Sequence, residues 1–398
     1  MWNFVFSKGL FYNFGRSNFP KIMRLFKVLL LVCSVNLVSN AAMPSVEVDS
    51  LTAMERQMVK FLSDSKVSAQ LFLGYRYHSA VGESHNEFAI KRGYITFSKN
   101  ITPYLSGRIT PDITVDQEGD GEGDVEMRLK YCFAEFKDPT RQGFFTEPSI
   151  LIGQVYTPFI EYEEKINRYR VEGAHYLDRI DQVSSADFGI TLTSLIGGKM
   201  DEDFQKRVNS NHAGKYGSFA LGVYNGGGYN ALEKNDNKTF QWRLTLRPLP
   251  NHIPGLQTSF TGALGKGNTP AAPDWNLYAG FLSFEQEYFV ITGQVYQALG
   301  DHTGRLVDPM GNPFKNWGQS LFGEVKLFSK KASIFARYDN NETYDTAIPT
   351  YSTRYIFGVA YHIQGKTKVV VDYNFLDNNQ GNPVPDTGIF EVMLELAF

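Results

Sequence analysis

Hydrophobic and polar residues alternate along most of the chain from residue 67 to its end. In the first such segment, Leu71, Leu73 and Tyr75 alternate with Gln70, Gly74 and Arg76. In the last, 390–398, five apolar residues alternate with Glu391, Met393, Glu395 and Ala397. Successive side chains of a β-strand point to opposite faces. The pattern therefore predicts strands with one apolar and one mixed, polar face.

Sixteen such segments of about 8–13 residues are predicted, an even number, as in bacterial outer-membrane barrels. They are 67–78, 87–99, 103–115, 125–137, 149–157, 185–196, 216–225, 238–247, 255–265, 275–284, 287–299, 317–328, 332–339, 353–364, 367–377 and 387–398. If the first strand starts in the periplasm, the later periplasmic connectors are very short and the extracellular ones are longer and polar. The exception is 197–215, which is either a folded excursion or a sign that the strand count is wrong.

These features predict an all-β fold, a transmembrane antiparallel β-barrel of about sixteen strands. Backbone groups in lipid must be paired within the fold, and a closed barrel pairs all of them. The C-terminal strand ending in Phe398 resembles the signal by which Gram-negative barrels are recognised for assembly. Trp275 and Trp317 are expected in an extracellular aromatic girdle. A soluble β-sandwich or β-helix is the alternative, but it explains neither Phe398 nor the loop asymmetry.

The N-terminal part carries an export signal. From Met23, a basic start precedes the apolar run V-L-L-L-V-C and the small residues before position 43. We expect cleavage after Ala41 or Ala42, so that 1–42 is an over-extended start plus signal peptide, with Met23 the expected initiator. Residues 43–66 form a periplasmic segment in which 51–63 has the spacing of a short amphipathic helix. Residues 67–398 form the barrel.

Charge and cysteine usage exclude several classes of function. Removing Lys8, Arg16, Lys21, Arg24 and Lys27 with the leader leaves 34 basic residues of 39, against 42 acidic ones. The mature chain is thus acidic, and nucleic acid is not an expected partner. Once Cys33 is cleaved off, Cys132 is alone, so neither a disulfide nor a cysteine metal cluster is expected. The acidic segment 116–124 lacks the EF-hand glutamate, and we expect no metal and no cofactor.

The longest extracellular connector, 158–184, is the candidate for selectivity. It is too apolar and aromatic for a solvated loop, and it contains Lys165, Arg168, Arg170 and Arg179 among six acids. We expect it to fold into the lumen and line a constriction, because the charges at the narrowest point select ions. A folded surface loop is the alternative. By alternation the wall adds inward cations: Arg76, Arg108, Arg128, Lys130, Arg243, Arg247, Arg337 and Arg354, and also Arg92 if the second strand keeps Tyr94 inside.

Several ordered motifs resemble the phosphate-selective porin family (porin O and P). They are R-G-Y-I-T-F at 92–97, N-I-T-P at 100–103, L-I-G-Q-V-Y-T-P-F at 151–159, S-A-D-F-G-I-T-L at 185–192 and G-V-Y-N-G-G-G at 222–228. The resemblance implies a homotrimeric barrel in the outer membrane of a Gram-negative bacterium, among lipid and lipopolysaccharide and inserted by the barrel assembly machinery. It also implies passive diffusion of small anions, phosphate or polyphosphate among them.

Three other functions are weighed against an anion porin. A general, non-selective porin would share the architecture, and a plugged structural or adhesion barrel would not conduct. An outer-membrane hydrolase would need a serine activated by a histidine. His362 is the best-placed histidine, but no serine partner can be identified from the pattern. We therefore expect no enzymatic activity.

Overall fold

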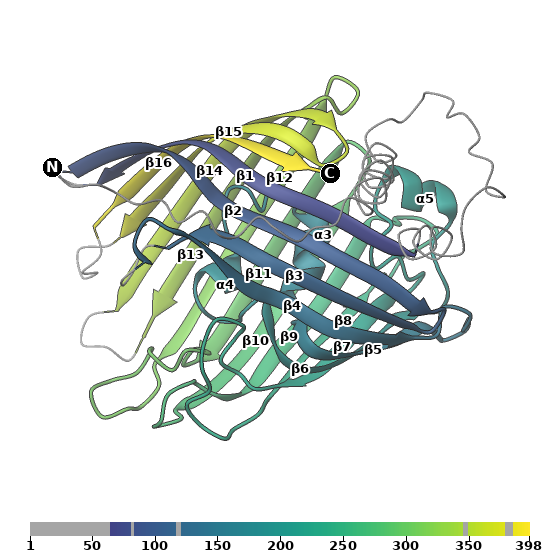
Figure 1. Ribbon diagram of the computed structural model, residues 1–398, viewed down its shortest axis with the longest axis horizontal. Helices are drawn as coiled ribbons and strands as arrows, with labels where there is room; N and C mark the ends of the chain where they lie inside the picture. The colour runs from purple at the N-terminus through teal and green to yellow at the C-terminus, as the bar shows by residue number, and fades with distance from the viewer. Residues whose placement is uncertain (1–63, 81–82, 117–120, 345–348, 379–384) are drawn as a thin grey trace, which may run out of the picture. The chain divides into compact units, whose positions relative to one another are not determined.

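The computed structural model describes residues 64–80, 83–116, 121–344, 349–378 and 385–398. The part from Ser65 onward forms one closed barrel of sixteen antiparallel strands, each paired with its neighbours in sequence (Figure 1). The first and last strands close the circle, with Leu73 opposite Leu394. The signal segment, the start at Met23 and the helix expected at 51–63 lie outside the described residues.

All sixteen predicted strands are confirmed, with boundaries that differ by a few residues. The strands are β1 Ser65–Ala80, β2 Glu83–Thr102, β3 Leu105–Val115, β4 Val125–Lys137, β5 Phe145–Tyr156, β6 Ala186–Ile196, β7 Gly217–Tyr224, β8 Thr239–Leu246, β9 Leu256–Lys266, β10 Asp274–Glu285, β11 Phe289–Leu299, β12 Lys315–Leu327, β13 Ala332–Thr343, β14 Thr350–Gln364, β15 Thr367–Asn378 and β16 Thr387–Ala397. The described parts of the connectors contain three short helices: α3 Ile160–Ile166, α4 Tyr176–Arg179 and α5 Glu202–Arg207.

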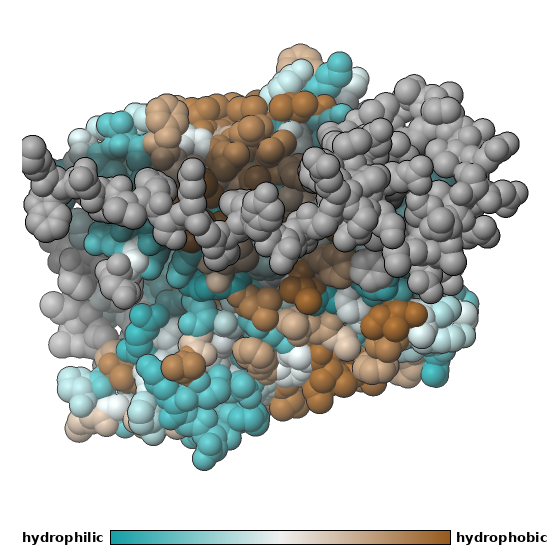
Figure 2. Space-filling view, in the orientation of Figure 1, coloured by the Kyte–Doolittle hydropathy of each residue, from teal (hydrophilic) through white to brown (hydrophobic). Residues whose placement is uncertain are grey.

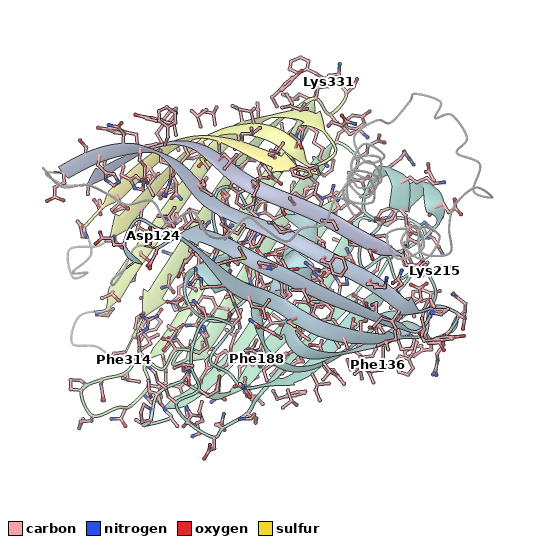
Figure 3. All side chains as sticks on the ribbon, viewed as in Figure 1. Asp124, Phe136, Phe188, Lys215, Phe314 and Lys331 are labelled. Atoms are coloured by element: carbon pink, nitrogen blue, oxygen red, sulfur yellow. The ribbon has the colours of Figure 1, made fainter. Side chains whose placement is uncertain are left out.

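The barrel is apolar outside, and its inner face carries polar as well as apolar residues. Along β10, Tyr278 and Leu282 on the outer face are 57% and 53% exposed, while Ser283 and Glu285 on the inner face are buried. Brown apolar residues accordingly gather across the middle of the barrel surface in Figure 2. Figure 3 shows side chains projecting from the strands around the outline of the barrel. No helix among the described residues is long and apolar enough to cross a membrane.

The two ends of the barrel differ. One, here called the short-turn end, carries the connectors 286–288, 328–331 and 365–366. The other, the long-loop end, carries 157–185, 225–238 and 300–314. The connector 197–216 is the long one at the short-turn end. It contains α5, capped by the Asp201 carboxylate, which accepts from Phe204 N at 2.8 Å. It is therefore a folded excursion, and the strand count stands.

Two β-bulges place neighbouring residues on the same inner face. Phe72 pairs with Arg92 and Leu73 with Ile90, so Lys91 is an extra residue on β2. In the same way Lys130 is extra on β4, where the register shifts between Thr110 and Pro111. A bulged strand bends, and its side-chain alternation is locally offset. As a result Lys91 and Arg92 both reach interior carboxylates, and Lys130 and Tyr131 are both buried.

The prediction that Trp275 lies in the extracellular aromatic girdle is wrong. Trp275 is fully buried, on the inner face of β10, and its ring lies 6.0 Å from that of His302. It starts its strand as expected, but the parity of β10 turns it inward with Leu277 and Phe281.

Candidate functional site: the loop inside the barrel

The connector 157–185, here called the lumen loop, packs against the inner face of the barrel wall. Its apolar side chains are buried in one cluster with inward-facing residues of β9 to β16. From the loop these are Phe159, Ile160, Tyr162, Ile166, Tyr169, Val171, Tyr176, Leu177 and Val183. The alternative of a surface loop does not fit this packing, and Figure 1 shows α3 and α4 among the strands of the barrel.

Aromatic residues of the loop contact the wall at three places. The Phe159 ring packs edge-on against Phe281 at 5.4 Å. The Tyr169 ring stacks on Phe335 with 4.0 Å between centroids, and its hydroxyl donates to Glu324 Oε1 at 2.8 Å. The Tyr176 hydroxyl donates to the Asn340 carbonyl. Because buried aromatic pairs of this geometry add to the energy of burial, the loop is held as a part of the core.

Wall cations bind the backbone of the loop. Lys91 Nζ donates to the Glu172 carbonyl at 3.0 Å, and Lys368 Nζ donates to that of Arg168 at 2.9 Å. Arg243 Nε donates to the Pro158 carbonyl at 2.9 Å, and its guanidinium lies 4.4 Å from the Tyr162 ring centroid. These inward cations thus position the loop and are largely shielded from the lumen.

A four-residue ion network lies between the loop and β13. Arg337 pairs with Glu172 and with Asp339, each at 2.9 Å. Arg179 pairs with the same two acids, at 3.4 Å and 3.0 Å. All four side chains are at most 14% exposed. Because the two arginines share both carboxylates and all four side chains are poorly exposed, the network holds the loop firmly against β13. Removing one partner would leave a buried charge unpaired, which is costly.

Glu163 in α3 and His175, just before α4, form a buried carboxyl–imidazole pair. Glu163 Oε1 lies 3.9 Å from His175 Nδ1. Burial raises the pKa of Glu163 to about 7, with Asp339 adding to the effect and Arg337 opposing it. Burial, with the charge of Arg337 next, holds the pKa of His175 well below its ordinary value. Neutral His175 can therefore face a carboxyl group that is about half protonated near pH 7.

The folded connector 197–216 supports the loop from the short-turn end. His212 Nε2 lies 2.7 Å from Glu161 Oε2 in α3. Asn209 Nδ2 donates to the Lys165 carbonyl at 3.1 Å, and the Arg168 guanidinium Nη2 donates to the Val208 carbonyl at 3.3 Å. Of the described connectors at this end, 197–216 is the longest, and α3 rests on it. We call it the floor connector.

The four predicted loop cations occupy three settings. Lys165 and Arg168 lie by the connector 197–216, with Lys165 3.5 Å from Glu161. Arg170 pairs with Glu164 at 3.4 Å and with Asp178 at 3.5 Å. Arg179 belongs to the ion network with Glu172 and Asp339. The structure does not gather these cations into one ring, and each has acidic or carbonyl partners.

The predicted wall cations on β2 to β4 lie together. Arg92 pairs with Asp112 at 2.9 Å, and Arg128 lies 3.3 Å from Glu126. Arg108 and Lys130 have no carboxylate partner among the described residues. Both face tyrosine rings. Arg108 donates to Thr110 Oγ1 at 3.0 Å and lies 4.8 Å from the Tyr131 ring. The Lys130 ammonium lies 4.8 Å, 5.4 Å and 5.9 Å from the rings of Tyr94, Tyr131 and Tyr229. We call Arg92, Arg108, Arg128 and Lys130 with these tyrosines the basic–aromatic face.

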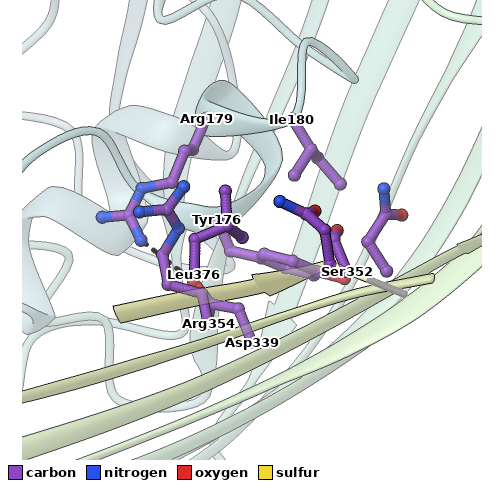
Figure 4. A pocket seen from close by; sticks show the side chains of 9 residues that line it. Tyr176, Arg179, Ile180, Asp339, Ser352, Arg354 and Leu376 are labelled. Atoms are coloured by element: carbon purple, nitrogen blue, oxygen red, sulfur yellow. Dashed lines mark hydrogen bonds and ion pairs between the residues drawn. The ribbon is translucent and has the colours of Figure 1, made fainter. Parts of the chain in front are cut away.

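A cavity of about 180 Å³ separates α4 from β13, β14 and β15 (Figure 4). Arg179 enters it from the loop and Arg354 from the wall, and the two side chains face one another. Arg354 donates to Asn374 Oδ1 at 2.7 Å and has no ion pair within the described part of the chain. With Asn341, Ser352 and Asn378 in its lining, the cavity offers donors suited to a small anion.

Tertiary structure supplies a serine near His362. Ser333 Oγ lies 2.8 Å from His362 Nε2 and 2.8 Å from Glu324 Oε1. The carboxylate therefore contacts the serine, whereas in a hydrolase triad it orients the histidine. Ser333 is also 1% exposed, which leaves no access for a substrate. These residues form a hydrogen-bonded chain that ends on Tyr169 of the loop.

Sequence reasoning missed Lys91, His212 and Ser333. Strict alternation puts Lys91 outside, and only the bulge turns it inward. Ser333 meets His362 through the pairing of β13 with β14. For His212, the available signal was the length of the connector 197–215, which indicated either a folded excursion or an error in the strand count.

No known family model matches the chain, and no curated protein matches it. Its fold is similar to those of solved porin structures. An anion-selective porin from Comamonas acidovorans superposes with a TM-score of 0.56 at 10% identity, over 84% of this chain and 100% of that one. OmpF of Salmonella typhi, in complex with daunomycin, gives 0.55 at 14% identity, over 83% and 97%. The trimer form of OmpT of Vibrio cholerae gives 0.53 at 11%, over 84% and 99%. The chain thus has the fold of a sixteen-stranded porin barrel.

Proposed function

We propose that this protein is an outer-membrane porin through which small anions diffuse passively. The apolar outer wall suits lipid, and the closed barrel leaves no unpaired strand edge. The lumen loop narrows the interior, and the cations of the wall select the solute. The short-turn end, which holds the floor connector, would face the periplasm. A homotrimer among lipopolysaccharide, inserted by the barrel assembly machinery, is part of the proposal, and the trimer form of the OmpT outer-membrane protein, which has a similar fold, supports it.

One observation carries the sign of the selectivity: the pairing of Arg108 and Lys130 with tyrosine rings in place of carboxylates. A ring stabilises a cation without cancelling its charge. Lys130 is 2% exposed, so water screens its field poorly, and Coulomb terms grow as the local dielectric constant falls. Glu135 lies farther along β4, where it accepts from Ser106 and Ser149 at 3.1 Å and 2.8 Å. The preference for anions should therefore be real but moderate.

The test is the double replacement of Arg108 and Lys130 by glutamine. Replacement of Lys331, an exposed lysine in a short turn, by glutamine is the matched control. The anion-to-cation permeability ratio of single channels should fall severalfold in the double variant and stay unchanged in the control. An unchanged ratio in both would remove the basic–aromatic face from the selectivity mechanism.

Phosphate as a preferred solute is the finer part of the proposal. The two arginines that face one another across the cavity of Figure 4 can bind an oxyanion by paired N–H donors. Single-channel current in chloride should decrease as phosphate is added, because a bound anion slows passage. Equal currents at all phosphate concentrations would favour a general porin.

A plugged barrel is the second candidate. The lumen loop and the connector 197–216 are hydrogen-bonded to each other, and together they could block the lumen. Planar bilayer recording separates the two. Stepwise conductance increases support the porin, and their absence with correctly folded protein supports the plug.

A further inference from the structure

Two histidines lie opposite each other near the long-loop end of the first hairpin. His78 of β1 and His85 of β2 are Cα partners in the register. Their imidazole rings stack with 4.5 Å between centroids and 5° between planes. Side chains of directly opposite residues on antiparallel strands lie on the same face at close range. The backbone of two rigid strands therefore presents two imidazoles side by side.

A carboxylate completes the group. Glu87 lies on the same face, two residues after His85, with Oε1 3.9 Å from His78 Nε2. That nitrogen is buried and has no hydrogen-bond partner among the described residues. One ligand atom from each of the three residues lies within 4.8 Å of the others. Bonds of about 2.0–2.1 Å to a tetrahedral ion place ligand atoms roughly 3.3 Å apart, so rotations that shift each atom by about 1 Å would close the site.

The neighbouring charges leave Glu87 free to turn. Arg76 lies 3.5 Å from Glu87, but it holds the buried Glu391 more closely, at 2.7 Å. Lys91 pairs with Glu391 as well, at 2.6 Å. If Glu87 rotated toward the imidazoles, Arg76 would therefore keep a carboxylate partner. The Glu87 side chain is 44% exposed, which gives it room to move.

We propose that His78, His85 and Glu87 bind a transition-metal ion such as Zn²⁺ at the mouth of the barrel. Two imidazoles and one carboxylate suit Zn²⁺, Cu²⁺ or Ni²⁺, whereas Ca²⁺ and Mg²⁺ require oxygen ligands. Three protein ligands leave one position open to water. The sequence pattern does not show the site, because only the pairing of β1 with β2 joins its two histidines. The proposal is independent of the solute that the pore passes.

The experiment is titration of detergent-purified protein without a histidine tag. Thiols are alkylated first, because Cys132 is exposed and could bind the metal itself. Zn²⁺ binding is followed by calorimetry at a pH of about 7.5, where imidazole is neutral. The variants are His78→Gln and His85→Gln, and the control is His252→Gln, an exposed histidine in the connector between β8 and β9. Heat-modifiable migration on gels shows that each variant is folded.

The unmodified protein and the His252 variant should bind one Zn²⁺ per chain with equal affinity. Each of the other two variants should bind at least about tenfold more weakly, since even outer partners of metal ligands change affinity by about 10–100-fold. Absence of stoichiometric binding by the unmodified protein would overturn the proposal. So would equal affinity in the His78 and His85 variants, which would place the ion elsewhere.

Discussion

His212 of the connector between β6 and β7 places Nε2 2.7 Å from Glu161 Oε2 in α3. The bond joins a connector of the short-turn end to a loop that enters from the opposite end. Although burial raises the pKa of Glu161, the charges of His212 and Lys165 outweigh it, so that the pKa lies below its ordinary value. Glu161 therefore stays ionised at neutral pH and accepts from the imidazole. The hydrogen bond therefore ties the connector 197–216 to the lumen loop.

Replacing His212 by alanine should loosen the loop. The half-buried Glu161 carboxylate loses its nearest partner but keeps Lys165 at 3.5 Å. The free energy of unfolding should therefore fall by about 1 kcal/mol, the lower end of the cost of an unsatisfied group. Denaturant unfolding measures the loss, and open-channel current noise should rise as α3 moves. The exposed His252→Ala variant is the control. Wild-type stability and noise in His212→Ala would mean that the connector does not hold the loop.

The stacking of Tyr169 on Phe335 should matter more than the hydroxyl of Tyr169. Phe335→Ala removes a buried ring and should cost about 3–5 kcal/mol. Tyr169→Phe keeps the stack and removes only the hydrogen bond to Glu324, for about 1–2 kcal/mol. Guanidinium unfolding followed by tryptophan fluorescence compares the two. The reverse order would show that the loop is anchored by polar contacts.

Glu163 should make the stability of the folded loop depend on pH. The folded carboxyl has a pKa of about 7, whereas an unfolded glutamate titrates near about 4.3. Between these values the folded protein holds a proton that the unfolded chain has lost, so stability falls as pH rises through this window. Glu163→Gln should flatten the curve between about pH 4 and pH 7, relative to the unmodified protein. Identical pH profiles of thermal unfolding would show that Glu163 is not buried in neutral form.

Deleting Phe398 should impair assembly at the cell surface. Its backbone adds the last bonds to the pairing of β1 with β16, with Ala69 N donating to Phe398 O at 2.8 Å, and its ring is 70% exposed. Deletion removes these last bonds and the terminal aromatic together, whereas Phe398→Tyr keeps both. Surface labelling should therefore show a loss in the deletion and normal levels in the tyrosine variant. Normal surface levels after deletion would refute the role of a recognition signal.

The strands could be predicted because each has one face against lipid and one against polar contents, which imposes period 2 on the sequence. The pattern fails where that condition fails. Along β10 the inner face is apolar as well, since Phe281 and Leu277 receive the lumen loop. Trp275 therefore looked like a girdle residue although it faces inward. Bulges also cannot be recognised from the pattern. An extra residue such as Lys91 shifts the alternation of one strand, but nothing in the sequence marks where the shift occurs.

The site was predictable in composition and not in geometry. The apolar content of 158–184 correctly indicated a packed loop, and alternation correctly turned Arg243 and Arg337 inward. Whether the positive charge of a cation is balanced by an acid depends on which residues it contacts. Arg337 is matched by Glu172, whereas Lys130 has only tyrosine rings. Those pairings join residues far apart in the chain, so a linear pattern cannot contain them.

The most direct test of the proposed function is the reversal potential of the unmodified protein in a planar bilayer across a potassium chloride gradient. Screening limits the field of exposed loop charges to about 8–10 Å at physiological salt, so the lumen decides the sign. The account predicts a reversal potential displaced toward the chloride equilibrium potential, by a moderate amount. Displacement toward the potassium equilibrium potential would contradict it.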